Sequence, residues 1–297
     1  MIFEGYRVIG IFVILLLGLM VASLFFGKAD LTIGGKNYTE QVILVHMVSD
    51  LIESHTGLKV RQRPFLGGTL VTFQALRQGS LDGYIEYTGT GLTVLLEREP
   101  LSDPDEVRLV VETEFKTLWD LEWLDALGFN NTYVMTINSK QAKELGVTKF
   151  SELEPFAAEL TLGATHEFLE RADGYPGLTR HYGFAFGKTR ALDPGLTYQA
   201  AAVGKVDVID AFATDGRIQA FDLHPLKDDK HYFPAYHGAP LFRADVLKKY
   251  PELKSVLRLL ANRLDDAAMR SLNYEVDSKK RDPLLVAREW LTADGLL

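Results

Sequence analysis

One design occurs twice in this sequence, as Gly79-Ser80-Leu81-Asp82-Gly83-Tyr84-Ile85-Glu86-Tyr87 and as Gly204-Lys205-Val206-Asp207-Val208-Ile209-Asp210-Ala211-Phe212. In both stretches a glycine is followed by any residue, an apolar residue, an aspartate and a short strand that ends in an aromatic residue. An apolar helical segment precedes each copy, and a small polar loop follows it. A helix closed by glycine, then a strand, then a loop at the strand's carboxyl end is how α/β proteins build ligand sites. Two copies predict two similar lobes that each present an aromatic wall to a shared cleft.

A second repeated stretch supports an internal duplication. Leu31-Thr32-Ile33-Gly34 precedes the first copy and Leu160-Thr161-Leu162-Gly163 precedes the second, and each leads into a predicted helix. Strand and helix patterns alternate between them, which favours an α/β fold. Chance similarity among short α/β segments remains the alternative explanation of the repeat.

Composition excludes several classes of protein. The chain has 297 residues, a formal net charge of −8 and no cysteine. Nucleic-acid binding requires clustered basic residues, which an acidic chain without a long basic run does not offer. Without cysteine there is no disulfide, thiolate metal site or cysteine nucleophile. The sequence also lacks the Gly-x-Ser-x-Gly, His-Glu-x-x-His and P-loop motifs, and its seven histidines are scattered. We therefore expect no enzyme activity, no metal and no cofactor.

The N-terminus carries an export or anchoring segment. No charged residue occurs between Val8 and Gly27, and Arg7 precedes this run. A helix of such length spans about 30 Å, the thickness of a bilayer's hydrocarbon core. Gly27 and Ala29 supply the small residues for cleavage after Ala29. Residues 1–29 are therefore predicted to be a signal peptide or a membrane anchor, with the remainder periplasmic or on the outer face of the cytoplasmic membrane.

Helix signals also occur in the middle and at the C-terminal end of the chain. Asp103 and Pro104 are a typical helix start, with an N-cap aspartate followed by proline. The last sixty residues are rich in helix and are expected to return to the first lobe. We expect the strands of the second lobe to be complete by Phe212.

Seven stretches, in this order, resemble the substrate-binding proteins of osmoprotectant ABC importers, the OpuAC/ProX-like type II periplasmic binding proteins that take up glycine betaine, choline and carnitine. The resemblance covers about residues 31 to 290. It is carried by Ile33-Gly34-Gly35-Lys36-Asn37-Tyr38-Thr39-Glu40-Gln41, Gly67-Gly68-Thr69, Glu86-Tyr87-Thr88-Gly89-Thr90, Gly128-Phe129-Asn130-Asn131-Thr132-Tyr133, Phe168-Leu169-Glu170-Arg171-Ala172-Asp173-Gly174-Tyr175, Asp210-Ala211-Phe212-Ala213-Thr214-Asp215 and Phe233-Pro234-Ala235-Tyr236.

The resemblance implies a two-lobed fold with two chain crossings. Residues 30–130 and 235–297 would form the first lobe, and residues 131–234 the second. It further implies a small quaternary-ammonium ligand, an ABC permease as partner and an ATPase on a separate chain. The ligand's cation would sit in an aromatic cage formed by Tyr87, Tyr133, Phe212 and Tyr236. Its carboxylate would meet Lys36, Thr90 and Arg171.

Physical chemistry is consistent with these residue types. A quaternary ammonium has no N–H to donate, but aromatic faces attract it. Arginine and lysine suit a carboxylate. This set favours a zwitterion such as glycine betaine, carnitine or proline betaine over choline. The family often has tyrosine at the position of Phe212, so the particular ligand is left open.

Several of these site residues also have a structural interpretation. Tyr133 can be a sheet residue, Arg171 a helix cap or a partner of Asp173, and Lys36 a solvated loop residue. Two alternatives for the whole protein remain: the same fold binding an amino acid or a larger betaine such as ergothioneine, or a membrane-anchored osmolyte sensor.

Overall fold

The computed structural model describes residues 29–170, 174–193 and 196–297. The predicted apolar segment Val8–Gly27 lies outside the described residues, as does Arg171. Within the described ranges, no helix combines the length and the apolar character needed to cross a bilayer.

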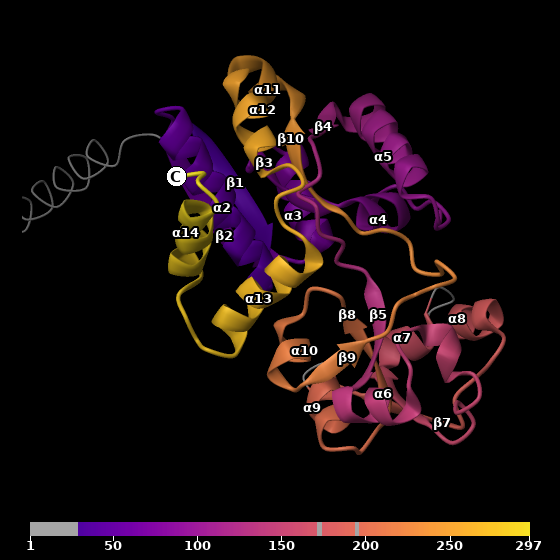
Figure 1. The fold of residues 1–297 in the computed structure, drawn as a ribbon. Coiled ribbons are helices and arrows are strands. Elements are labelled where there is room, and N and C mark those ends of the chain that lie inside the picture. Colours follow the sequence, from indigo (N-terminus) through magenta and orange to yellow (C-terminus); the bar gives the residue numbers. More distant parts are fainter. Residues whose placement is uncertain (1–28, 171–173, 194–195) are drawn as a thin grey trace, which may run out of the picture.

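Two five-stranded sheets of matching topology organise the fold (Figure 1). In the first sheet the order is β2-β1-β3-β10-β4; β1 runs parallel to β2 and β3, and β10 runs antiparallel to β3 and β4. The strands of this sheet are β1 (Leu31–Lys36), β2 (Val60–Gly67), β3 (Gly83–Tyr87), β4 (Leu121–Trp123) and β10 (Gly238–Arg243).

The second sheet repeats this arrangement in the order β7-β6-β8-β5-β9. Its strands are β5 (Tyr133–Asn138), β6 (Thr161–Thr165), β7 (Lys188–Leu192), β8 (Val208–Phe212) and β9 (Leu223–Pro225). The parallel pairs are β6 with β7 and β8, and the antiparallel pairs are β5 with β8 and β9. The expectation that the strands end at Phe212 was wrong. The short β9 is held by its pairing with β5, and three residues are too few to show a strand period.

The helices pack around these sheets. Those that precede β5 are α2 (Thr39–His55), α3 (Thr69–Arg77), α4 (Thr88–Thr90), the π-helical turn η1 (Gly91–Leu95) and α5 (Pro104–Trp119). Those between β5 and β10 are α6 (Ser139–Leu145), the 3-10 turn η2 (Phe150–Leu153), α7 (His166–Glu170), α8 (Tyr175–Tyr182), α9 (Thr197–Ala202) and α10 (Gly216–Ala220). The predicted start of α5 is confirmed, because the Asp103 side chain accepts the Asp105 backbone N–H at 2.9 Å.

The C-terminal helices return to the first sheet, as expected. They are α11 (Ala244–Lys249), α12 (Glu252–Leu257), the 3-10 turn η3 (Arg258–Leu260), α13 (Asp266–Asp277) and α14 (Pro283–Ala293). Helices α12, α13 and α14 all pack on α2, the long helix after β1 (Figure 1). Their apolar faces share one core cluster with α2, in which Leu51, Leu272 and Leu291 are buried.

The repeated aspartate has the same structural role in both lobes. Asp82 accepts the backbone N–H of Thr32 at 2.7 Å, and Asp207 accepts the backbone N–H of Thr161 at 2.7 Å. The backbone N–H of each aspartate donates back to the carbonyl of the same threonine, at 2.8 and 2.9 Å. Each aspartate therefore fastens the start of its strand to the start of the neighbouring parallel strand.

The other repeated positions also serve this junction. Gly79 and Gly204 both have positive φ, +75° and +68°, which glycine adopts without strain where a helix ends. In β1, which carries the second repeated stretch, a Cβ on Gly34 would lie 2.4 Å from the Leu81 side chain. The repeat is thus a packing unit that delivers an aromatic residue to the end of β3 and of β8.

The chain passes twice between the lobes, through 124–132 and 226–237, and the two segments lie side by side. The backbone N–H of Asn131 donates to the Tyr236 carbonyl at 3.1 Å, and the backbone N–H of Tyr236 donates to the Asn130 side chain at 2.7 Å. Helix α13 makes a third contact between the lobes, because it packs on α10 of the second lobe (Figure 1).

Candidate ligand-binding site

A cavity of about 700 Å³ lies between the lobes. Six of the seven predicted site residues line it: Lys36, Tyr87, Thr90, Tyr133, Phe212 and Tyr236. They come from β1, the end of β3, α4, the start of β5, the end of β8 and the second crossing segment. The seventh, Arg171, lies outside the described residues.

Two aromatic rings from the second lobe form one wall. Tyr133 and Phe212 are register partners in the antiparallel pair β5–β8, and their ring centroids are 4.6 Å apart. Phe168 of α7 and Phe233 of the second crossing pack against the Tyr133 ring at 5.3 and 5.7 Å. Phe212 is 41% exposed and so leaves an aromatic surface open to the cavity.

Tyr236 is positioned by the loop after β3. A Cβ on Gly89 would lie 2.7 Å from the Tyr236 ring and 2.9 Å from the Ala235 carbonyl oxygen. Only glycine therefore lets the turn of α4 approach the second crossing this closely. The same turn carries Thr90 into the lining of the cavity.

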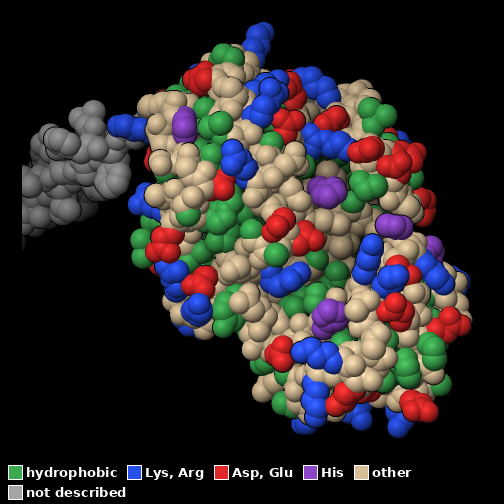
Figure 2. Space-filling view, viewed as in Figure 1, with side chains coloured by type: hydrophobic (Ala, Val, Ile, Leu, Met, Phe, Trp, Pro, Cys, Tyr) green, Lys and Arg blue, Asp and Glu red, His purple; other side chains and the backbone are tan. Residues whose placement is uncertain are grey.

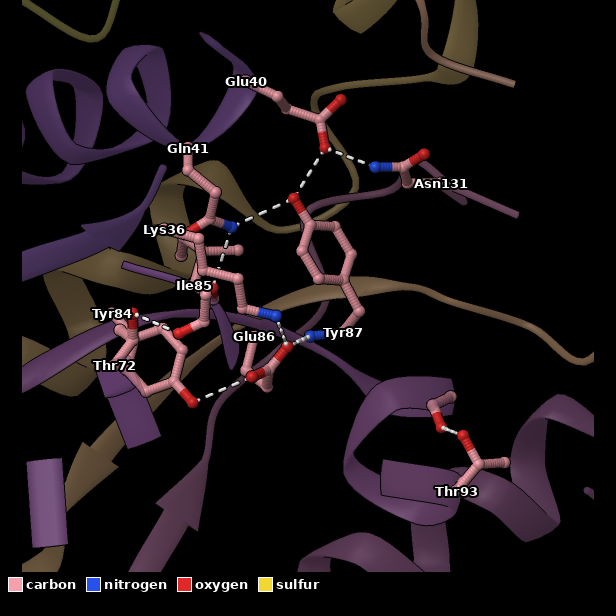
Figure 3. A network of polar contacts seen from close by, with 12 residues as sticks. Lys36, Glu40, Gln41, Thr72, Tyr84, Ile85, Glu86, Tyr87, Thr93 and Asn131 are labelled. Carbon is pink, nitrogen blue, oxygen red and sulfur yellow. Dashed lines mark hydrogen bonds and ion pairs between the residues drawn. The ribbon is translucent and has the colours of Figure 1, made fainter. Parts of the chain in front are cut away.

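Tyr87 is held firmly and is mostly buried, with 3% of its surface exposed. Its hydroxyl donates to Glu40 Oε1 at 2.7 Å and accepts from Gln41 Nε2 at 3.0 Å (Figure 3). Burial raises the pKa of Tyr87 well above its usual value, so the phenol is neutral and remains a donor. Tyr38 stacks on the ring at 6.5 Å and also lines the cavity.

Lys36 has a structural partner that the sequence interpretation did not include. Its Nζ lies 2.5 Å from Oε1 of Glu86, and both side chains are almost fully buried (Figure 3). The same Glu86 accepts from the Tyr84 hydroxyl at 2.8 Å and from the Tyr87 backbone N–H at 2.7 Å. Nζ also lies 5.0 Å from the centre of the Tyr87 ring. Lys36 therefore reaches the cavity as one half of a buried ion pair, and not as a solvated loop residue.

Other lining residues were not predicted: Tyr38, Thr39, Glu40, Thr69, Thr93, Val94, Asn131, Thr214, Asp215, Arg217, Asn273, Asp277 and Lys280. Several lie within the seven stretches that carry the family resemblance, next to predicted site residues. Their position beside those residues was therefore a usable signal. Asn273, Asp277 and Lys280 had no such signal. They reach the cavity only because the C-terminal part of the chain packs back between the lobes.

Two charged side chains that line the cavity, Arg217 and Asp215, pair with each other. Arg217 forms a bidentate contact with Asp215, at 3.0 Å and 2.6 Å, and lies 4.0 Å from the Tyr198 ring. On the outer face shown in Figure 2, basic and acidic side chains are interspersed over both lobes. That face has no basic patch of the kind that binds nucleic acid.

Two α/β lobes of matching topology, two crossings and a cavity between the lobes define a periplasmic binding protein of type II. The chain belongs to the family described as the substrate binding domain of ABC-type glycine betaine transport system, which matches residues 29–293. Members of this family are extracytoplasmic solute-binding proteins of transporters.

Individual relatives agree with this assignment. The carnitine transport binding protein OpuCC of Listeria monocytogenes is 36% identical over 266 residues, covering 89% of this chain and 86% of that protein. A glycine-betaine-binding protein of Pseudomonas aeruginosa is 36% identical over 292 residues, covering 94% and 92%. The crystal structure of a glycine betaine/carnitine/choline ABC transporter superposes with a TM-score of 0.86 at 34% identity, covering 90% of this chain and 99% of that one.

Proposed function

We propose that this chain captures a quaternary-ammonium zwitterion of the betaine type in the cavity between its lobes. The observation that carries the proposal is the convergence of Lys36, Tyr87, Thr90, Tyr133, Phe212 and Tyr236 on one cavity from both lobes and from a crossing segment. Relatives named for carnitine and for glycine betaine support this ligand class.

The aromatic residues recognise the cationic head. Each ring face contributes roughly 0.5–2 kcal/mol to the binding of a quaternary ammonium, depending on how fully the site excludes water. The methyl groups add apolar burial. Tyr87 and Tyr236 meet the cation from one side, and Tyr133 and Phe212 from the other. Ligand is therefore bound best when both lobes contact it.

The carboxylate end is bound by Lys36, Thr90 and Arg171. An ammonium has three N–H donors, and Glu86 uses one of those on Lys36, so two remain for the ligand. Arg171 directly follows Glu170, the last residue of α7, and Phe168 of this helix packs against the Tyr133 ring. A guanidinium offers two parallel donors to a carboxylate.

Ligand binding is coupled to lobe closure. Residues 30–130 together with 235–297 move as one body and 131–234 as the other, about the paired crossing segments. The closed form is then presented to an ABC permease, whose ATPase is a separate chain. The protein performs no catalytic step. It is delivered outside the cytoplasmic membrane by residues 1–29, which act as a signal peptide or an anchor.

Calorimetry with the purified chain tests the proposal. Glycine betaine, carnitine and proline betaine should bind more tightly than choline, which lacks the carboxylate. Equal or tighter binding of choline would contradict the roles of Lys36, Thr90 and Arg171. Mass spectrometry of ligand that co-purifies with the chain would identify the preferred betaine directly.

A further inference from the structure

Glu40 is a buried acidic residue at the wall of the cavity, in the first turn of α2. It is 3% exposed. Its Oε1 accepts from the Tyr87 hydroxyl at 2.7 Å and from Asn131 Nδ2 at 3.0 Å (Figure 3). Its Oε2 accepts from Asn273 Nδ2 at 3.0 Å. The Thr214 side chain is a further hydrogen-bond partner.

These partners come from separate parts of the molecule. Tyr87 ends β3 in the first lobe, Asn131 lies in the first crossing, Asn273 lies on α13, and Thr214 lies in the loop after β8 of the second lobe. Asn273 also donates to the Thr214 carbonyl at 2.8 Å. Glu40 is therefore anchored where both lobes, a crossing and α13 meet.

We infer from the hydrogen-bond pattern that Glu40 is ionised. The phenol, both amide nitrogens and the threonine hydroxyl can each donate, and a carboxylate can accept all four, whereas a protonated carboxyl must donate one bond itself. Burial raises the pKa of Glu40, and the hydrogen bonds from its partners oppose that rise. All of these donors are neutral.

No cation in the described part of the chain pairs with Glu40. The nearby ammonium of Lys36 is neutralised by Glu86, at 2.5 Å. The Glu40 carboxylate thus leaves a negative charge in the cavity wall. It accepts a hydrogen bond from the hydroxyl of Tyr87, whose ring faces the proposed ligand. Buried charges are costly unless an opposite charge compensates them.

We propose that Glu40 is the specificity-determining counter-charge of the site, which makes the cavity select a cationic head over a neutral head of the same shape. This inference rests on the proposed betaine-binding function and adds a residue and a selection rule to it. The Tyr87 hydroxyl is the link, because a phenol that donates to an anion has a more electron-rich ring and a stronger attraction for a cation. The carboxylate also attracts the cation directly through a medium of low polarity.

The test compares glycine betaine with tert-butylacetate, in which carbon replaces the quaternary nitrogen and the shape and the carboxylate are kept. Calorimetry gives the ratio of the two affinities for the wild type and for Glu40→Gln, with circular dichroism to establish folding. We expect the preference for betaine to fall about ten-fold in Glu40→Gln. Lost packing or hydrogen bonding alone would weaken both ligands alike and leave the ratio unchanged.

Two further variants sharpen the comparison. Glu53→Gln removes the same charge from an exposed position of the same helix and should leave the ratio at its wild-type value. The double variant Glu40→Gln/Asn131→Asp returns a carboxylate to the cluster and should restore most of the preference.

Each outcome decides between explanations. A folded Glu40→Gln protein with a wild-type ratio, or a double variant with no recovery, would overturn the inference. If Glu40→Gln does not fold, Glu40→Asp replaces it: the charge is kept, so the ratio should stay near that of the wild type, and a ten-fold fall would overturn the inference. A wild-type protein that binds no betaine would instead refute the proposed function, which separates the two failures.

Discussion

Replacing Lys36 with methionine tests whether the buried ion pair with Glu86 supports the fold of the first lobe. Both side chains are almost fully buried, and the distance between Nζ and Oε1 is 2.5 Å. Methionine removes the cation and leaves the buried Glu86 side chain without its counter-charge. Breaking a buried pair from one side costs about 3–5 kcal/mol. We expect Lys36→Met to lower the free energy of unfolding of the ligand-free protein by that amount.

Urea denaturation without ligand measures this change, as a lower midpoint with an unchanged slope. The matched control is Lys36→Met/Glu86→Gln, which removes the stranded charge while the introduced amide still accepts from the Tyr87 backbone N–H and meets the Tyr84 hydroxyl. It should recover more than half of the lost stability. If Lys36 served only the ligand carboxylate, the single variant would keep its ligand-free stability; a loss below about 1 kcal/mol would therefore refute the structural role.

Three further predictions concern the repeat and the cavity. Asp82→Ala and Asp207→Ala each leave the backbone N–H of a strand residue without its acceptor, and denaturation should show a similar loss of about 1–3 kcal/mol in both; a loss in only one would contradict their equivalence. Gly89→Ala places a methyl 2.7 Å from the Tyr236 ring, so calorimetry should show weaker betaine binding, and wild-type affinity would argue against Tyr236 as a ligand contact. Tyr133→Ala removes a ring of the second-lobe wall and should lower affinity at least about ten-fold; an unchanged affinity would place the cage elsewhere.

Local pattern was enough to predict much of the fold. The predicted helix start at Asp103 and Pro104 matches α5, because an N-cap aspartate followed by proline is a local signal. The repeated glycine and aspartate predicted two similar lobes, and the structure shows that each aspartate fastens two parallel strands. Such units depend on residues close in the sequence or on one neighbouring strand.

Predictions failed where a residue's role depends on a distant partner. The short β9 exists through its pairing with β5 and has too few residues for a periodic pattern. No feature of the sequence indicated that Glu40, Gln41 and Tyr38 enclose Tyr87 and leave it 3% exposed. No feature of the sequence indicated that Asn273 lines the cavity, because α13 reaches the cavity wall only by packing between the lobes.

Local patterns along the chain were sufficient to predict the class of this protein: two α/β lobes, an aromatic residue at the end of each repeated strand, and a set of rings and cations suited to a betaine. How the charges in that set are compensated depends on the folded structure. It paired Lys36 with Glu86 across 50 residues, and it brought Asn273 to Glu40 across 233 residues. Electrostatic compensation depends on distance through space and on burial, and neither quantity can be read from the order of residues along a chain.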